Sequence, residues 1–96
     1  MAPPLEETES MPCISEFYGI MIYFYWNDHQ TPHFHAKYGE FEILVNINTL
    51  EIIEGKFPAR AKAMVLEWAS EHRAALIEDW ELCKSKQQPN KIPPLA

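Results

Sequence analysis

The stretch FEILVNINTLEIIE, residues 41–54, decides the fold of this chain. Apolar side chains occupy every second position of residues 41–47, and polar side chains stand at two of the three positions between them. This period of two is typical of a strand with one face on a hydrophobic core. Asn48 and Thr49 then supply turn residues, and residues 51–54 return as the partner strand. The sequence therefore predicts a β-hairpin.

Two further strands are predicted upstream of this hairpin. Residues 20–26, IMIYFYW, are rich in aromatic and β-branched side chains, so we expect a strand that is covered on both faces. Residues 33–38 form a shorter candidate between Pro32 and Gly39. Alternation along this second strand separates a polar face from an apolar one, with His33, His35 and Lys37 against Phe34, Ala36 and Tyr38.

The remaining stretch, residues 59–86, is predicted to be helical. It follows Pro58, contains neither Gly nor Pro, and is dense in Ala, Leu, Met, Glu and Lys. The run is long for so small a chain, so we expect a break near Ser70-Glu71-His72 and two helices. Side chains at helical spacing form one stripe that must lie on the sheet. The stripe consists of Ala61, Met64, Val65, Trp68, His72, Leu76, Trp80 and Cys83. The expected fold class is α+β, a small antiparallel sheet of about four strands followed by two C-terminal helices packed on it.

Length and composition predict a single α+β domain over residues 11–86. The 96 residues are 47% hydrophobic and 12% aromatic, which is enough to fill one packed interior. Residues 1–10 combine prolines with three glutamates and are predicted to be a flexible acidic tail. Met11-Pro12 resembles a second start, so we interpret this tail as an extension. Residues 87–96 contain three prolines and are predicted to be a flexible Pro-rich tail.

Charge and cysteine content narrow the classes of function. Fourteen acidic and eight basic residues give a formal charge of -6, which disfavours a nucleic-acid coat protein because such binding depends on clustered Lys and Arg. An enzyme acting on RNA, or a module that binds a basic partner, stays open. Cys13 and Cys83 have no paired spacing, which favours a reducing cytoplasm. The longest apolar run has seven residues, far below the roughly 20 that span a bilayer. We expect a cytoplasmic protein without a membrane segment.

The residues that can carry chemistry gather in the segment NDHQTPHFH, residues 27–35. The segment places three of the four histidines beside Asp28 in a connection between strands, where binding groups commonly gather. His33 and His35 project from the same face of a strand, with Cα atoms about 7 Å apart. His29 or Asp28 could supply a third group from the preceding loop. The candidate site residues are therefore Asp28, His29, His33 and His35.

Three interpretations of this cluster stay open. The histidines could brace the turn through hydrogen bonds to backbone carbonyls, with Phe34 anchoring the strand in the core. They could instead hold zinc or another transition metal, with an open position for water. In the third interpretation, one imidazole oriented by Asp28 acts as a general acid or base on a hydroxyl or water. The sequence does not choose among the three, and it identifies no cofactor.

Lys37 and His72 are two further residues that could contribute to such a site. Lys37 shares the face of His33 and His35, so a small patch of His and Lys could meet an anionic ligand, although a solvated strand face is the simpler explanation. His72 lies on the apolar stripe, where it is explained as a core histidine bonded to a carbonyl, or as a residue that reaches the cluster.

Several motifs invite a comparison when they are taken together: Met11-Pro12-x-Ile14-Ser15, Phe17-x-Gly19-Ile20-x-Ile22, Asn27-Asp28-His29-x-x-Pro32-His33-Phe34-His35, Glu54-Gly55, Glu67-Trp68, His72-Arg73 and Trp80. They resemble the bacterial domain-of-unknown-function 4160 family over roughly residues 11–83. The block from Asp28 to His35 is the most specific part of the resemblance. Two features depart from the family pattern, namely the acidic tail before Met11 and Leu50, where a glycine commonly follows the hairpin turn.

The resemblance implies a partnered module, because members of this family are small stand-alone proteins described as toxin components encoded beside a small partner protein. One hypothesis is therefore a toxin-like effector of a bacterial toxin-antitoxin-type module, held in check by a cognate small protein. Its His/Asp cluster would act on RNA or another phosphate compound by acid-base or metal-assisted hydrolysis. The alternative is a non-catalytic protein-binding module whose histidines only shape the loop, or a domain that binds metal without catalysis.

Overall fold

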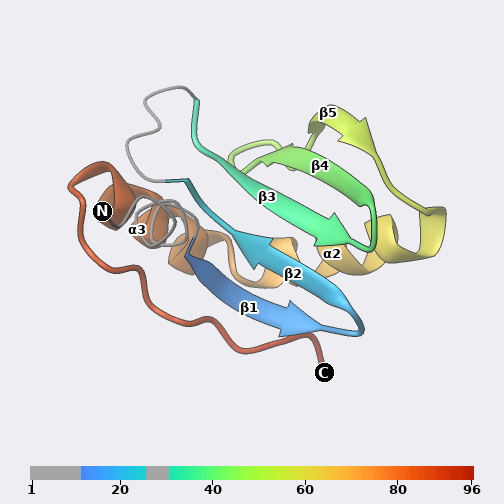
Figure 1. Ribbon diagram of the computed structural model, residues 1–96. Helices are drawn as coiled ribbons and strands as arrows, with labels where there is room; N and C mark the ends of the chain where they lie inside the picture. The colour runs from blue at the N-terminus through green and yellow to red at the C-terminus, as the bar shows by residue number, and fades with distance from the viewer. Residues whose placement is uncertain (1–11, 26–30) are drawn as a thin grey trace, which may run out of the picture.

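The computed structural model describes residues 12–25 and 31–96, which form one antiparallel sheet backed by two helices (Figure 1). Neighbours along the chain are also neighbours in the sheet, whose strand order is β1-β2-β3-β4-β5. The strands are β1 (Cys13–Phe17), β2 (Ile20–Tyr23), β3 (His33–Tyr38), β4 (Phe41–Asn46) and β5 (Ile52–Lys56). The α+β class is confirmed. The sheet has five strands rather than about four, and the additional one is β1.

A bulge explains why the sequence did not predict β1. The adjacent residues Ile14 and Ser15 are both buried, and the pairing with β2 shifts between Cys13 and Ser15. A bulge sets two residues opposite one and so interrupts the alternation of period two. The neighbouring strand β2 ends at Tyr23, and Met21 within it is 40% exposed. The prediction that this strand is covered on both faces is therefore wrong.

The predicted break in the helical region is confirmed. Helix α2 (Ala59–Glu71) and helix α3 (Arg73–Lys84) are separated by His72 alone. His72 has φ -123° and ψ 26°, outside helical geometry, and its amide donates to the carbonyl of Ala69 at 3.2 Å. The chain thus leaves helical geometry at this one residue.

Both helices lie on the same face of the sheet (Figure 1), and the hydrophobic core lies between the helices and the sheet. The ring of Trp68 from α2 lies 5.4 Å from Phe17 and 6.0 Å from Phe34 between centroids, and Trp80 from α3 lies 6.1 Å from Phe24. Burial of each such side chain contributes about 1.5–3 kcal/mol. The predicted helical stripe is confirmed for its buried members, which are Ala61, Val65, Trp68, Leu76, Trp80 and Cys83.

The register of the sheet sorts its side chains onto two faces. Tyr23 lies opposite His35, which lies opposite Leu44 on the next strand, and Lys37 lies opposite Glu42. We call the face that carries these five residues the outer face. The intervening residues form the inner face against the helices: Ile20, Ile22, Phe34, Ala36, Ile43 and Val45. The prediction that His35 and Lys37 share one face is confirmed.

The turn between β4 and β5 holds Leu50 in a backbone conformation that favours glycine. The side-chain oxygen of Asn46 accepts the amides of Asn48 at 2.8 Å and Thr49 at 3.1 Å. Leu50 then has φ 64°, in the left-handed region. Glycine adopts this region without steric penalty, whereas other residues lose roughly 1–2 kcal/mol there. Glycine would therefore fit this position best, and Leu50 occupies it with backbone strain.

Residues 87–96, which we call the C-terminal strap, have no regular secondary structure but pack along β1 (Figure 1). The amide of Ile92 donates to the carbonyl of Ile14 at 2.9 Å, and the indole Nε1 of Trp68 donates to the carbonyl of Pro93 at 2.8 Å. The side chain of Ile92 is buried. The prediction of a flexible tail did not anticipate these contacts.

The predicted acidic tail, residues 1–10, lies outside the described residues. Within residues 12–25 and 31–96, no helix has both the length and the apolar character needed to cross a membrane.

Candidate functional site

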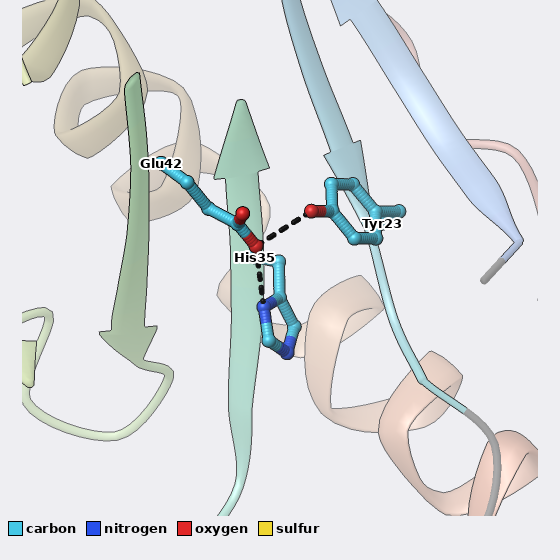
Figure 2. Close-up of polar contacts among 3 residues, drawn as sticks. All are labelled: Tyr23, His35 and Glu42. Atoms are coloured by element: carbon cyan, nitrogen blue, oxygen red, sulfur yellow. Dashed lines mark hydrogen bonds and ion pairs between the residues drawn. The ribbon is translucent and has the colours of Figure 1, made fainter. Parts of the chain in front are cut away.

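One glutamate oxygen joins side chains from three neighbouring strands on the outer face (Figure 2). Tyr23 of β2 donates its hydroxyl hydrogen to Oε2 of Glu42 at 2.7 Å, and Nδ1 of His35 lies 3.3 Å from the same oxygen. Tyr23 is directly opposite His35, whereas Glu42 is opposite Lys37 and reaches back diagonally. We call this arrangement the Tyr23–Glu42–His35 triad.

The triad sets the tautomer of His35. A carboxylate only accepts hydrogen bonds, so Nδ1 of His35 must carry the hydrogen that faces Glu42. In the neutral imidazole the lone pair then belongs to Nε2. Nε2 is itself buried, so it can accept a proton from a hydroxyl or a water molecule only where the ring is uncovered.

Tyr23 is a hydrogen-bond donor in this triad rather than a base. Burial raises the pKa of Tyr23 well above its ordinary value of 10.0, and the hydrogen bond and negative charge of Glu42 raise it further. The phenol therefore stays protonated at every physiological pH. Its role is to hold Glu42, and Glu42 in turn holds His35.

Two tyrosine rings fix the plane of the His35 ring. Tyr23 stacks on it at 5.3 Å between centroids with an interplanar angle of 17°, and Tyr25 meets it edge-on at 4.2 Å. His35 is 5% exposed. A ring held by a hydrogen bond on one side and by aromatic contacts on its faces has little rotational freedom, which is the condition for an oriented acid or base.

His33 lies beside His35 and has a different set of contacts. Its Nδ1 lies 2.8 Å from the carbonyl oxygen of Thr31, so Nδ1 is the donor. The two imidazole centroids are 5.3 Å apart, and the His33 ring also lies 5.1 Å from Trp80 of α3. His33 is 3% exposed. A bond from a buried histidine to the carbonyl just before a strand is the contact that the bracing interpretation predicts.

The structure brings together two of the four residues proposed from the sequence. His33 and His35 point to the same side and touch, whereas Asp28 and His29 lie outside the described residues. The carboxylate that orients His35 is Glu42, where the sequence had suggested Asp28. Within residues 12–25 and 31–96, no group of three or more His, Cys, Asp or Glu side chains is placed to hold a metal ion.

Sequence reasoning missed Tyr23 and Glu42, and only the second had a usable signal. The turn at Gly39 and Glu40 has two residues, so residue 37 must face residue 42 across the hairpin. That pairing places Glu42 one diagonal step from His35. The pairing of Tyr23 with His35 depends on the long connection between β2 and β3, for which no sequence rule gives the register.

On β5, Gly55 packs directly against the backbone of Glu42. Gly55 has φ 94°, and a Cβ atom at this position would overlap the carbonyl oxygen of Glu42. Next to the triad is an open hollow of about 370 Å³, which is lined by Glu42, Leu44, Glu54 and Gly55. Only glycine lets the two strands approach this closely, so Gly55 positions Glu42 and shapes the hollow.

The family described as a domain of unknown function, DUF4160, matches residues 19–81 of the chain. This range holds four of the five strands, the whole triad, His33 and all of α2. Comparison with curated proteins and with solved structures gave no match.

Proposed function

We propose that this chain, which belongs to the family described as a domain of unknown function, DUF4160, is a small toxin-like effector. In this proposal His35 acts as a general base on RNA or another phosphate compound. In this proposal a cognate small protein holds the effector in check. The observation that carries the proposal is the shared Oε2 of Glu42, which is held by Tyr23 and faces Nδ1 of His35. A base that is oriented by a carboxylate is a recurring device for activating hydroxyl groups.

The chemistry needs one proton acceptor and one proton donor. Nε2 of His35 takes the proton of a hydroxyl or a water molecule, whose oxygen then attacks phosphorus. The bond from phosphorus to the leaving oxygen breaks, and this oxygen takes up a proton from water. Glu42 stabilises the positive charge that develops on His35, as a carboxylate does for the histidine of a catalytic triad.

Charge restricts the form of the substrate. With a formal charge of -6, the chain disfavours extended contacts with a phosphate backbone. Base stacking on aromatic rings contributes about 1–3 kcal/mol per base and does not depend on net charge. The substrate of this proposal is therefore one or two nucleotides of an exposed strand, with a base against the partly exposed ring of Tyr25 beside His35.

A growth experiment tests this function. The wild-type chain and a His35→Ala variant are expressed without any partner, and growth and RNA integrity are followed. We expect the wild type to arrest growth and degrade RNA, and His35→Ala to do neither. Glu54→Gln, on the same face but outside the triad, is the matched control and should behave like the wild type. Healthy growth with wild-type protein, or equal toxicity of His35→Ala, would remove the proposal.

A second function, a non-catalytic module that binds a partner protein, is favoured by the contacts of His33. Its bond to Thr31 and its near-complete burial are those of a bracing residue. Thermal unfolding separates the two functions, because removal of a bracing histidine lowers the midpoint, while removal of a catalytic group leaves it unchanged or raises it. A His33→Ala midpoint well below that of the wild type, together with a harmless wild-type protein, would favour the binding module.

A further inference from the structure

A buried carboxylate ties the C-terminal strap to helix α3. Asp79 is 1% exposed, and its Oδ1 accepts the backbone amide of Asn90 at 2.9 Å. Its second oxygen, Oδ2, is buried without a hydrogen-bond partner among the residues that the structure describes. An ionised oxygen in this state is strongly disfavoured, because the interior does not replace its hydration. The site therefore accommodates Asp79 better as a neutral acid than as an ion.

The charged and titratable groups near Asp79 do not offset a negative charge on it. Glu78, adjacent on α3, adds a like charge, and Cys83, one turn further on, is a buried thiol. Lys91 is the cation of the strap, and its Nζ donates to the carbonyl of Cys13 at 2.7 Å. Burial raises the pKa of Asp79 to about 6; the hydrogen bond from Asn90 lowers it, and Glu78 raises it further.

The other contacts of the strap are weak enough that ionisation of Asp79 can shift the equilibrium between its docked and released states. Two neutral hydrogen bonds hold the strap, one from the Ile92 amide to the Ile14 carbonyl and one from the Trp68 indole to the Pro93 carbonyl. Such bonds contribute only modestly to stability, because water replaces them when they open. The apolar anchor is the buried side chain of Ile92. The strap also covers the backbone edge of β1, which would otherwise be an unpaired sheet edge.

We propose that the C-terminal strap is a pH-sensitive device, held on β1 by protonated Asp79 and loosened when Asp79 ionises. This inference goes beyond the proposed function and does not depend on it. In the released state Asp79 meets water, and its pKa returns to the ordinary value of about 3.9. Ionisation between about pH 4 and pH 6 therefore favours release, and the docked strap is favoured at lower pH. Release uncovers the edge of β1.

Amide hydrogen exchange of the full chain, followed by NMR from about pH 4.5 to about pH 8, tests this proposal. The protection factor, which is the ratio of the intrinsic to the measured exchange rate, removes the intrinsic effect of pH. We expect the protection factor of Ile92 to fall more than tenfold across this range, since each unit of pKa difference changes the docking equilibrium tenfold. We also expect it to stay below that of Ala36 in the central strand, because the strap opens without the sheet.

Two variants make the test specific. Asp79→Asn keeps an oxygen that accepts the Asn90 amide but cannot ionise, so its Ile92 protection factor should not vary with pH. Glu78→Gln is the matched control and should keep the pH dependence. A constant Ile92 protection factor in the wild type, equal protection of Ile92 and Ala36, or an unchanged pH dependence in Asp79→Asn would each overturn the proposal. If Asp79→Asn does not fold, the titration of the Asp79 carboxyl in the wild type supplies the test. Its midpoint must equal the midpoint of the pH dependence of the Ile92 protection factor, and different midpoints would overturn the proposal.

Discussion

Removal of the Tyr23 hydroxyl is the most direct test of the triad. In Tyr23→Phe the ring remains, so its stacking on His35 at 5.3 Å and its edge contact with Tyr25 at 5.8 Å are kept, and only the bond to Glu42 is lost. Hydrogen bonds to charged groups contribute about 1.5–3 kcal/mol. The Glu42 side chain is 36% exposed, so water takes over part of the lost contact. We expect the free energy of unfolding to fall by about 1–2 kcal/mol.

Urea unfolding measures this loss, and a double-mutant cycle with Glu42→Ala assigns it to the bond. In the Glu42→Ala background, Tyr23→Phe should have almost no effect or a small stabilising one, because the buried hydroxyl has already lost its acceptor. The matched control is Tyr38→Phe, whose ring is exposed on β3 and whose stability should lie within about 0.5 kcal/mol of the wild type. A coupling free energy near zero would refute the view that Tyr23 holds Glu42.

The other predictions concern the strap, the tight approach of β4 and β5, and the buried thiol. The pKa of folded Asp79, about 6, lies above its unfolded value, so the contribution of Asp79 to the free energy of unfolding should fall by about 3 kcal/mol as the pH rises from about 3 to 7. Urea unfolding of Asp79→Asn should lack this pH-dependent contribution, and identical pH profiles of the variant and the wild type would contradict the prediction. Gly55→Ala should lower the free energy of unfolding by at least about 2 kcal/mol, because its Cβ overlaps the carbonyl of Glu42; a neutral result in urea would show that the strands can separate at no cost. Ile92→Ala should lower it by about 2–4 kcal/mol, and a value below about 0.5 would mean that the strap is not anchored in the core. Burial and the charge of Asp79 raise the pKa of Cys83 to about 11, so a thiol reagent at neutral pH should modify Cys83 far more slowly in the folded chain than in urea, and equal rates would contradict its burial.

The sequence predicted those elements whose signal is local. The alternation of residues 41–47, the glycine at position 39 and the unbroken helical composition of residues 59–86 were enough for strands β3 to β5 and for a break near His72. Each of these signals acts within a few residues, so no knowledge of distant partners was required. The face shared by His35 and Lys37 followed from the same local rule.

The elements that the sequence did not predict depend on contacts between distant residues. The strap is held by Ile14 and Trp68, which are 78 and 25 residues away from the strap residues that they bond, and a proline-rich stretch gives no sign of such partners. The triad depends on the register between β2 and β3, across a connection with no short turn to set it. Histidines clustered in the sequence showed where a site could be, but not which carboxylate would orient them.

The shared carboxylate oxygen of the triad also resists sliding of the strands. The smallest slip that keeps inner and outer faces in place is two residues, which moves a strand by about 7 Å and would separate the atoms that Glu42 holds at 2.7 and 3.3 Å. One carboxylate oxygen thus holds three strands in a single alignment, on the face of the sheet opposite α2 and α3. A chain that lacks Glu42 should therefore sample shifted pairings while it folds, and would reach its native alignment more slowly than a chain weakened by the same amount in the core.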